Sequence, residues 1–260
     1  QECDQDGASI RLPTNVKEEK MEISNRTQKL GTENSFEVLS EVNQLKNEGK
    51  DIVNFCIGQP DFDTPQHIKD AAITSIREGK TGYTDSAGIF PAREAVARYI
   101  SRTREIDANP DHVVIGNGSK HFIAFIILCT TDFGVGDEVI YPNPGYPIYE
   151  SQIIANGVVP VPLPLTEKMK FSFKIEELEK RITRRTKLLI LNTPQNPTGG
   201  VLEQSDLVVI AELAKKHDIW VFADEIYCQI VYEKNSQALP HCLVCMRGRS
   251  FAMVYPRRMQ

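Results

Sequence analysis

The chain has 260 residues, with 30 lysines and arginines against 35 aspartates and glutamates, which gives a formal net charge of −5. This acidic balance, without a stripe of basic residues, argues against a nucleic-acid partner. No apolar run approaches the about 20 residues that a membrane span needs. Residues 1–20 also lack the apolar core of a secretory signal. Six cysteines scattered along a chain of this length fit the reduced thiols of a cytoplasmic protein better than a disulfide framework.

The N-terminal part divides into a leader and a helix. Residues 1–20 are polar and carry no hydrophobic pattern, so we expect a disordered leader, with an ordered N-terminal arm as the alternative. Residues 21–50 form an N-terminal segment in which apolar side chains recur at helical spacing from residue 35 to 48, and Gly49 supplies a helix stop signal.

Two further helices and a short strand come next. Residues 52–57 form an apolar run, predicted as a strand, that ends at Gly58-Gln59-Pro60. Helices are predicted over residues 65–78 and 91–103, and residues 82–88 between them form a loop by composition.

From residue 112 onward, short apolar runs alternate with amphipathic stretches. The predicted strands are 112–115, 138–141, 158–161, 187–191 and 219–223, and the predicted helices between them are 119–129, 147–155, 175–182 and 204–217. Strands that are apolar throughout, separated by helices, indicate an α/β fold with a mostly parallel sheet and helices on both faces. Such sheets bind ligands beyond the carboxyl ends of their strands, so the residues after each strand are the candidate site.

Three of these strands are followed by loops of unusual composition. Residues 116–120 open a helix, where free backbone N–H groups and the helix dipole suit a phosphate, although such turns are often only turns. This loop lacks the Walker and dinucleotide patterns. Tyr146 lies among the prolines of residues 142–147, which suits stacking on a flat ring or plain packing of a tyrosine. Residues 192–200 are too elaborate for a simple connection, and Asn196 offers an amide to a ligand.

The last predicted strand leads directly into Asp224-Glu225-Ile226-Tyr227. A carboxylate at the carboxyl end of a strand can pair with a protonated ring nitrogen. Taken alone, a solvated acidic pair is the alternative interpretation.

Together with Gly58-Gln59-Pro60-Asp61-Phe62, these four loops resemble the class I/II, fold type I aminotransferases that depend on pyridoxal phosphate (PLP), in the aspartate aminotransferase-like branch. The resemblance implies an incomplete PLP-binding large domain over residues 51–234, with the small domain largely missing. It implies that these residues bind the cofactor: Gly118, Ser119 and Lys120 at its phosphate, Tyr146 on its ring face, Asn196 and Tyr227 at its 3-oxygen, and Asp224 at its ring nitrogen. Tyr83 would reach the phosphate of a partner subunit, which implies a homodimer, and Gly58 would lie near the carboxylate of an amino acid or 2-oxo acid substrate.

Residues 235–260 depart from the family. The lysine that the family bonds to the cofactor is absent, because Lys234 comes too early and in the wrong context, so no catalytic residue is assigned. Shifting the codons of this tail by one base permits a segment that contains Ser-Lys-Thr-Tyr-Ala, so we expect an out-of-frame tail, with a spliced or divergent tail as the alternative. The apolar runs 243–246 and 251–255 are the tail's candidates for a strand, and Cys242 and Cys245, without a second pair, do not indicate a metal site.

The sequence therefore predicts a PLP-dependent aminotransferase, with this chain itself inactive. A PLP-dependent β-lyase of the same fold shares every motif quoted, and a catalytically dead PLP-binding protein is the alternative of a different class.

Overall fold

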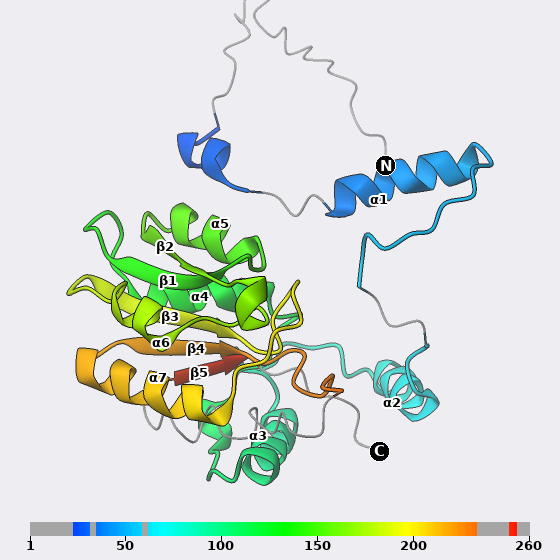
Figure 1. The fold of residues 1–260 in the computed structure, drawn as a ribbon. Coiled ribbons are helices and arrows are strands. Elements are labelled where there is room, and N and C mark those ends of the chain that lie inside the picture. The colour runs from blue at the N-terminus through cyan, green and yellow to red at the C-terminus, as the bar shows by residue number, and fades with distance from the viewer. Residues whose placement is uncertain (1–22, 32–34, 59–61, 233–249, 254–260) are drawn as a thin grey trace, which may run out of the picture.

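A parallel sheet forms the centre of the protein. The computed structural model describes residues 23–31, 35–58, 62–232 and 250–253. The expected leader, the Gln59-Pro60-Asp61 part of the Gly58 motif, and most of the expected out-of-frame tail, including Cys242 and Cys245, lie outside the described residues. Five strands are hydrogen-bonded in the order β2-β1-β3-β4-β5 (Figure 1), and every neighbouring pair is parallel. The strands are β1 (Glu138–Asn143), β2 (Val159–Pro164), β3 (Thr186–Asn192), β4 (Trp220–Asp224) and β5 (Ser250–Met253).

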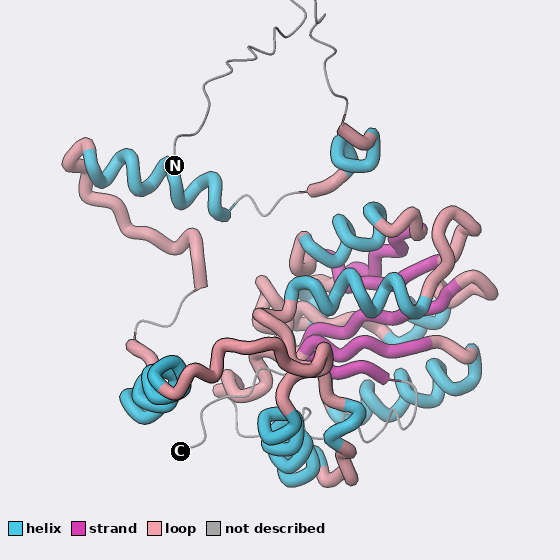
Figure 2. The backbone as a smooth tube through the Cα atoms, turned by 180° about the vertical axis from the view of Figure 1, so that it is seen from behind, coloured by secondary structure: helices cyan, strands magenta, loops and turns pink. Residues whose placement is uncertain are grey.

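Helices cover both faces of this sheet, which confirms the predicted α/β architecture (Figures 1 and 2). On one face lie α4 (Lys120–Thr130) and α5 (Ile148–Ala155), and on the other lie α6 (Ile175–Glu179) and α7 (Gln204–His217). Alternate residues of β3 enter the two layers: Leu189 and Leu191 pack with α6 and α7, whereas Leu188 and Ile190 pack with α4 and α5. A strand that is buried on both faces needs apolar residues at every position, which explains the uninterrupted runs in the sequence.

Three helices precede these layers: α1 (Ser35–Asn47), α2 (Gln66–Arg77) and α3 (Phe90–Arg104). The first two bury no residue and lie away from the sheet (Figures 1 and 2). By contrast, α3 buries Ala97, Ile100 and Arg104. Short 3-10 turns are found at η1 (Asn25–Lys29), η2 (Pro110–His112) and η3 (Glu167–Met169). Among the described helices, none combines the length and the apolar character that a membrane crossing requires.

The outer edge of the sheet, formed by β2, is protected by its sequence. The backbone N–H of Val159 donates to the carbonyl of Asp137, just before β1, at 2.9 Å, and that of Leu165, just after β2, donates to the carbonyl of Asn143 in β1 at 2.7 Å. Odd-numbered residues of β2 therefore bond inward, so the even-numbered Pro160, Pro162 and Pro164 occupy the positions whose nitrogens point away from the sheet. Proline has no N–H, so this edge offers few donors to another strand.

Two predicted strands are wrong. Residues 52–57 and 112–115 have no strand structure, and Phe55 is 91% exposed. The reason is the lack of a pairing neighbour among the described residues: the N–H of Ile115, for example, donates to the carbonyl of Ala87 in a loop. An apolar run becomes a strand only where another strand accepts its hydrogen bonds.

The other predicted strands and helices are confirmed, with small differences at their ends; α6, for instance, ends at Glu179 rather than at residue 182. The tail also contributes β5, which begins one residue before the predicted apolar run 251–255 and pairs with β4 on the side away from β3, Met253 lying opposite Asp224.

Candidate functional site

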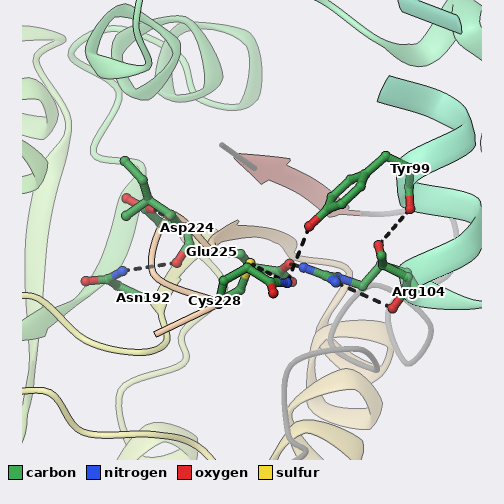
Figure 3. Close-up of polar contacts among 9 residues, drawn as sticks. Tyr99, Arg104, Asn192, Asp224, Glu225 and Cys228 are labelled. Carbon is green, nitrogen blue, oxygen red and sulfur yellow. Dashed lines mark hydrogen bonds and ion pairs between the residues drawn. The ribbon is translucent and has the colours of Figure 1, made fainter. Parts of the chain in front are cut away.

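Three loops meet at the carboxyl edge of the sheet, where β1, β3 and β4 end. Asn192 and Asp224 are the last residues of adjacent strands and are paired in the sheet register. The side chain of Asn192 is buried, and its Nδ2 donates to the carbonyl of Asp224 at 3.0 Å (Figure 3). Its Oδ1 accepts from the N–H of Asn196 at 2.7 Å. One amide therefore ties the end of β4 to the loop that carries Asn196.

Asp224 is a buried acid held by neutral donors. Its side chain is 4% exposed, Oδ2 accepts from the hydroxyl of Tyr149 at 2.6 Å, and Oδ1 accepts from the N–H of Ile226 at 3.3 Å. Burial raises the pKa of Asp224 to about 6, and the two hydrogen bonds oppose that rise. Among the described residues no cation forms an ion pair with Asp224. This carboxylate is therefore suited to accept a hydrogen bond from a positively charged group of a ligand.

Aromatic side chains surround this acid. Tyr149 is fully buried, and burial, followed by the nearby Asp224, raises its pKa well above the usual value. The phenols of Tyr146 and Tyr227 raise the pKa of Tyr149 further, which places all three tyrosines in one electrostatic neighbourhood. The rings of Tyr146 and Tyr149 meet edge to face, with centroids 5.7 Å apart. Asn196 lies beside Tyr227, with 3.4 Å between its Nδ2 and the phenol oxygen.

The loop before α4 enters the helix through a glycine in the left-handed region. Gly118 adopts a φ of +82°, and a side chain is disfavoured in that conformation. Ser119 is the N-cap residue of α4, although its side chain makes no capping hydrogen bond. Lys120 is exposed at the first position of the helix, with its Nζ 5.5 Å from the centre of the Phe36 ring.

Two of the predicted site residues lie outside this cluster. Tyr83 is fully exposed in the loop before α3, so it makes no packing contact with the residues around Asp224. Gly58 is also exposed, and a Cβ built on it would meet nothing within 4 Å.

A buried ion pair that sequence reasoning missed lies next to this acid. Arg104, near the end of α3, is 2% exposed and donates through Nε and Nη2 to Oε2 of Glu225, at 3.1 and 2.6 Å (Figure 3). Glu225 is fully buried, where burial raises its pKa and Arg104 opposes that rise. The interpretation of Asp224 and Glu225 as a solvated acidic pair is therefore wrong, because both carboxylates are enclosed.

Sequence reasoning also missed Tyr149, which contacts Asp224 directly. Tyr149 lies in the first turn of α5, three residues after Tyr146 in the preceding loop, and this short spacing is the signal that would have brought it into the site.

Known proteins match this fold and sequence. A family profile described as aminotransferase class I and II matches residues 50–257. A probable aspartate/prephenate aminotransferase of Aquifex aeolicus is 36% identical over 210 residues, which cover 81% of this chain and 53% of that protein. An aspartate aminotransferase of Bacillus subtilis is 33% identical over 212 residues, 82% of this chain and 53% of that protein.

Solved structures agree. The aspartate aminotransferase from Thermus thermophilus with maleate superposes with a TM-score of 0.84 at 31% identity, covering 90% of this chain and 60% of that one. The aspartate aminotransferase from Thermotoga maritima gives a TM-score of 0.81 at 29% identity, covering 89% of this chain and 61% of that one. The chain spans about half the length of the curated relatives that it matches.

Proposed function

The chain belongs to the class I and II aminotransferase family, and we propose that its protein moves an amino group between an amino acid and a 2-oxo acid with PLP as cofactor. Members of this family depend on PLP. Bound PLP supplies a protonated pyridine ring that withdraws electrons from the substrate.

The observation that carries the proposal is the state of Asp224. Within the described residues, this carboxylate is 4% exposed and is held by a hydroxyl and a backbone N–H, without the cation that usually accompanies a buried charge. The protonated ring nitrogen of PLP has the charge and the hydrogen that this carboxylate accepts. Asp224 would keep that nitrogen protonated, since an adjacent negative charge favours the charged form of the ring.

The neighbouring residues fit the rest of the cofactor. Asn196 and Tyr227, whose polar atoms lie 3.4 Å apart, would donate to the 3-oxygen of the ring. Tyr146 would lie against the ring face, supported edge-on by Tyr149. Gly118, Ser119 and Lys120 at the start of α4 would hold the phosphate with backbone N–H groups and a positive charge. These assignments agree with the chemistry of each group, so the residues present fit PLP.

The complete site is proposed to need more than this chain. Tyr83, which is fully exposed, would reach the phosphate held by a partner subunit in a homodimer, and Gly58 would lie near the substrate carboxylate. No lysine in the family context follows Tyr227 in the chain, so we expect the 260-residue chain to bind PLP without a covalent bond and without turnover. The described cysteines Cys56, Cys129 and Cys228 are free thiols, which supports a cytoplasmic location.

A titration of the chain with PLP tests the proposal. Trp220 is the single tryptophan and lies four residues before Asp224 in β4, about 13 Å along an extended strand, so a bound pyridoxal ring should quench its emission. Asp224→Ala should weaken binding about tenfold or more, whereas Glu212→Ala, an exposed acid on α7, should not. Equal affinity in Asp224→Ala and the unmodified chain would contradict the role of Asp224.

A second measurement separates covalent from non-covalent binding. Borohydride reduction followed by mass analysis should leave no PLP adduct on the chain. A reduced adduct on a lysine beside the site, such as Lys120, would overturn the expectation of non-covalent binding.

A further inference from the structure

We propose that Gln195 is a positioning residue that holds the loop of Tyr146 against the loop of Asn196, and so fixes the two sides of the cofactor ring relative to each other. The proposal rests on the proposed function and assigns a role to a side chain that does not itself contact the ring.

The side chain of Gln195 links two loops from different strands. It is 5% exposed, and its Nε2 donates to the carbonyl of Pro144 at 2.8 Å. Its Oε1 accepts from the N–H and the hydroxyl of Thr198, at 3.0 and 2.5 Å. Each end of the amide therefore has a defined partner, one in the loop after β1 and the other in the loop after β3.

The backbone of Gln195 also helps to close its own loop. Its N–H donates to the carbonyl of Gly200 at 2.9 Å, and its carbonyl accepts from the N–H of Gly199 at 2.8 Å. The loop of residues 193–200 is consequently shaped by main-chain bonds together with the bonds from Thr198 to Oε1 of Gln195. This leaves the bond from Nε2 to Pro144 as a link whose effect lies outside the loop in which Gln195 is found.

The loop of Tyr146 needs such a link because it contains few donors of its own. Pro142, Pro144 and Pro147 have no N–H. A tight turn brings Gly145 so close to the carbonyl of Pro142 that a Cβ would lie 2.1 Å from that oxygen. The carbonyl of Pro144, two residues before Tyr146, is where the neighbouring loop attaches.

Fixing these loops matters for the proposed site. Asn196 follows Gln195 directly, and Tyr146 follows Pro144 by two residues. Asn196 is assigned to the edge of the ring and Tyr146 to its face. A binding site tolerates displacements of only about 0.5 Å before contacts of this kind weaken. The hydrogen bond between the loops therefore bears on both contacts, alongside the bond from the N–H of Asn196 to Asn192.

The test compares the full chain with Gln195→Glu, Gln195→Met and Gln204→Glu. In Gln195→Glu, one oxygen still accepts from Thr198, but the other is an acceptor facing the carbonyl of Pro144, so the link between the loops is lost. Gln195→Met removes the link without adding a charge, and it also removes the acceptor of the two bonds from Thr198. The control, Gln204→Glu, makes the same chemical change at an exposed residue at the start of α7.

The readouts are the Kd for PLP, from quenching of Trp220, and the circular dichroism induced in bound PLP, which reports how the ring is held. We expect both Gln195 variants to raise the Kd about tenfold and to lose most of the induced signal, with Gln204→Glu unchanged. Far-ultraviolet dichroism of each free variant establishes that it is folded. If one Gln195 variant does not fold, the other decides the outcome.

Two results would overturn the inference, and they differ in what else they affect. If the unmodified chain binds PLP and a folded Gln195 variant gives the same Kd and the same induced signal, Gln195 is only a satisfied buried amide. If the unmodified chain does not bind PLP, the proposed function fails and this inference fails with it.

Discussion

Replacing Arg104 with methionine removes the only cation that an ion pair gives to Glu225 among the described residues. The two side chains are 2% and 0% exposed, so water does not substitute for the lost partner. One oxygen of Glu225, Oε1, has no hydrogen-bond partner within the described part of the chain, and the change would leave Oε2 without its two bonds from Arg104.

The expected cost is large because the carboxylate stays buried while its compensation is removed. Breaking a buried pair by removing one partner lowers the free energy of unfolding by about 3–5 kcal/mol. A domain has only about 5–15 kcal/mol in total, so the variant should be marginal. Removing both charges is different, because well-packed apolar residues often replace a buried pair without loss. The double variant Arg104→Met, Glu225→Leu should therefore recover most of the stability.

The cost should also depend on pH. Burial already raises the pKa of Glu225, and loss of Arg104 removes an opposing influence, so the pKa in the folded variant rises further. A carboxyl whose folded pKa lies above its unfolded value contributes stability at low pH, and that contribution is lost as the pH rises through the folded pKa. The penalty of Arg104→Met should therefore be greater at pH 8 than at pH 5.

Urea unfolding followed by Trp220 emission measures these differences. The control is Arg98→Met on the same helix, whose ion pair with Glu94 is exposed and worth less than about 1 kcal/mol. A free energy of unfolding for Arg104→Met within 1 kcal/mol of the unmodified chain, at both pH values, would refute the reasoning.

Three further changes test the site. Asp224→Asn should raise the free energy of unfolding of the free chain by about 3 kcal/mol above pH 6. Burial raises the pKa of Asp224 from 3.8 to about 6, so the unmodified chain loses stability as the pH rises through this interval and the Asn variant does not. In urea unfolding the difference should vanish below about pH 4, and a pH-independent difference would contradict burial as its cause. Tyr149→Phe removes the hydroxyl that lowers the pKa of Asp224, so the pH dependence of unfolding should move to higher pH, and an unchanged profile would refute the influence of that bond. Gly200→Ala should destabilise the chain by about 1–3 kcal/mol, because its Cβ would lie 2.6 Å from the carbonyl of Phe171; Gly58→Ala, with nothing within 4 Å, is the matched control in thermal unfolding, and equal stabilities would contradict the close approach.

The sequence predicted correctly the part of the fold in which strands pack against helices that are close to them in the chain. Between residues 138 and 217, β1, β2 and β3 are each followed in the chain by a helix that packs on the sheet, so pattern and structure agree. Residues 52–57 and 112–115 have equally apolar patterns but no pairing neighbour in the described chain. Periodicity shows that a segment suits burial, but it does not supply the partner.

The residues of the candidate site likewise divide into those that could be recognised in the sequence and those that could not. Asp224, Asn196 and Tyr146 could be recognised because polar or aromatic residues at the ends of apolar strands are conspicuous in the sequence. Arg104 could not, because a cation in the last turn of a helix ordinarily complements the helix dipole in solvent. Its burial depends on Glu225, which lies 121 residues later in the chain.

The two adjacent acids at the end of β4 have different partners, and this difference defines what the site can bind. In the part of the chain that the structure describes, Glu225 is paired with Arg104, whereas Asp224 is held by the hydroxyl of Tyr149 and the N–H of Ile226. If both acids lacked a cation, their repulsion would favour a proton on one of them, since like charges at close range raise a carboxyl pKa. By neutralising Glu225, Arg104 allows the negative charge of the loop to remain on Asp224. The loss of stability that burial of Asp224 imposes on the free chain is therefore recoverable by a cationic ligand atom placed at that carboxylate, and the protonated nitrogen of the proposed cofactor is such an atom.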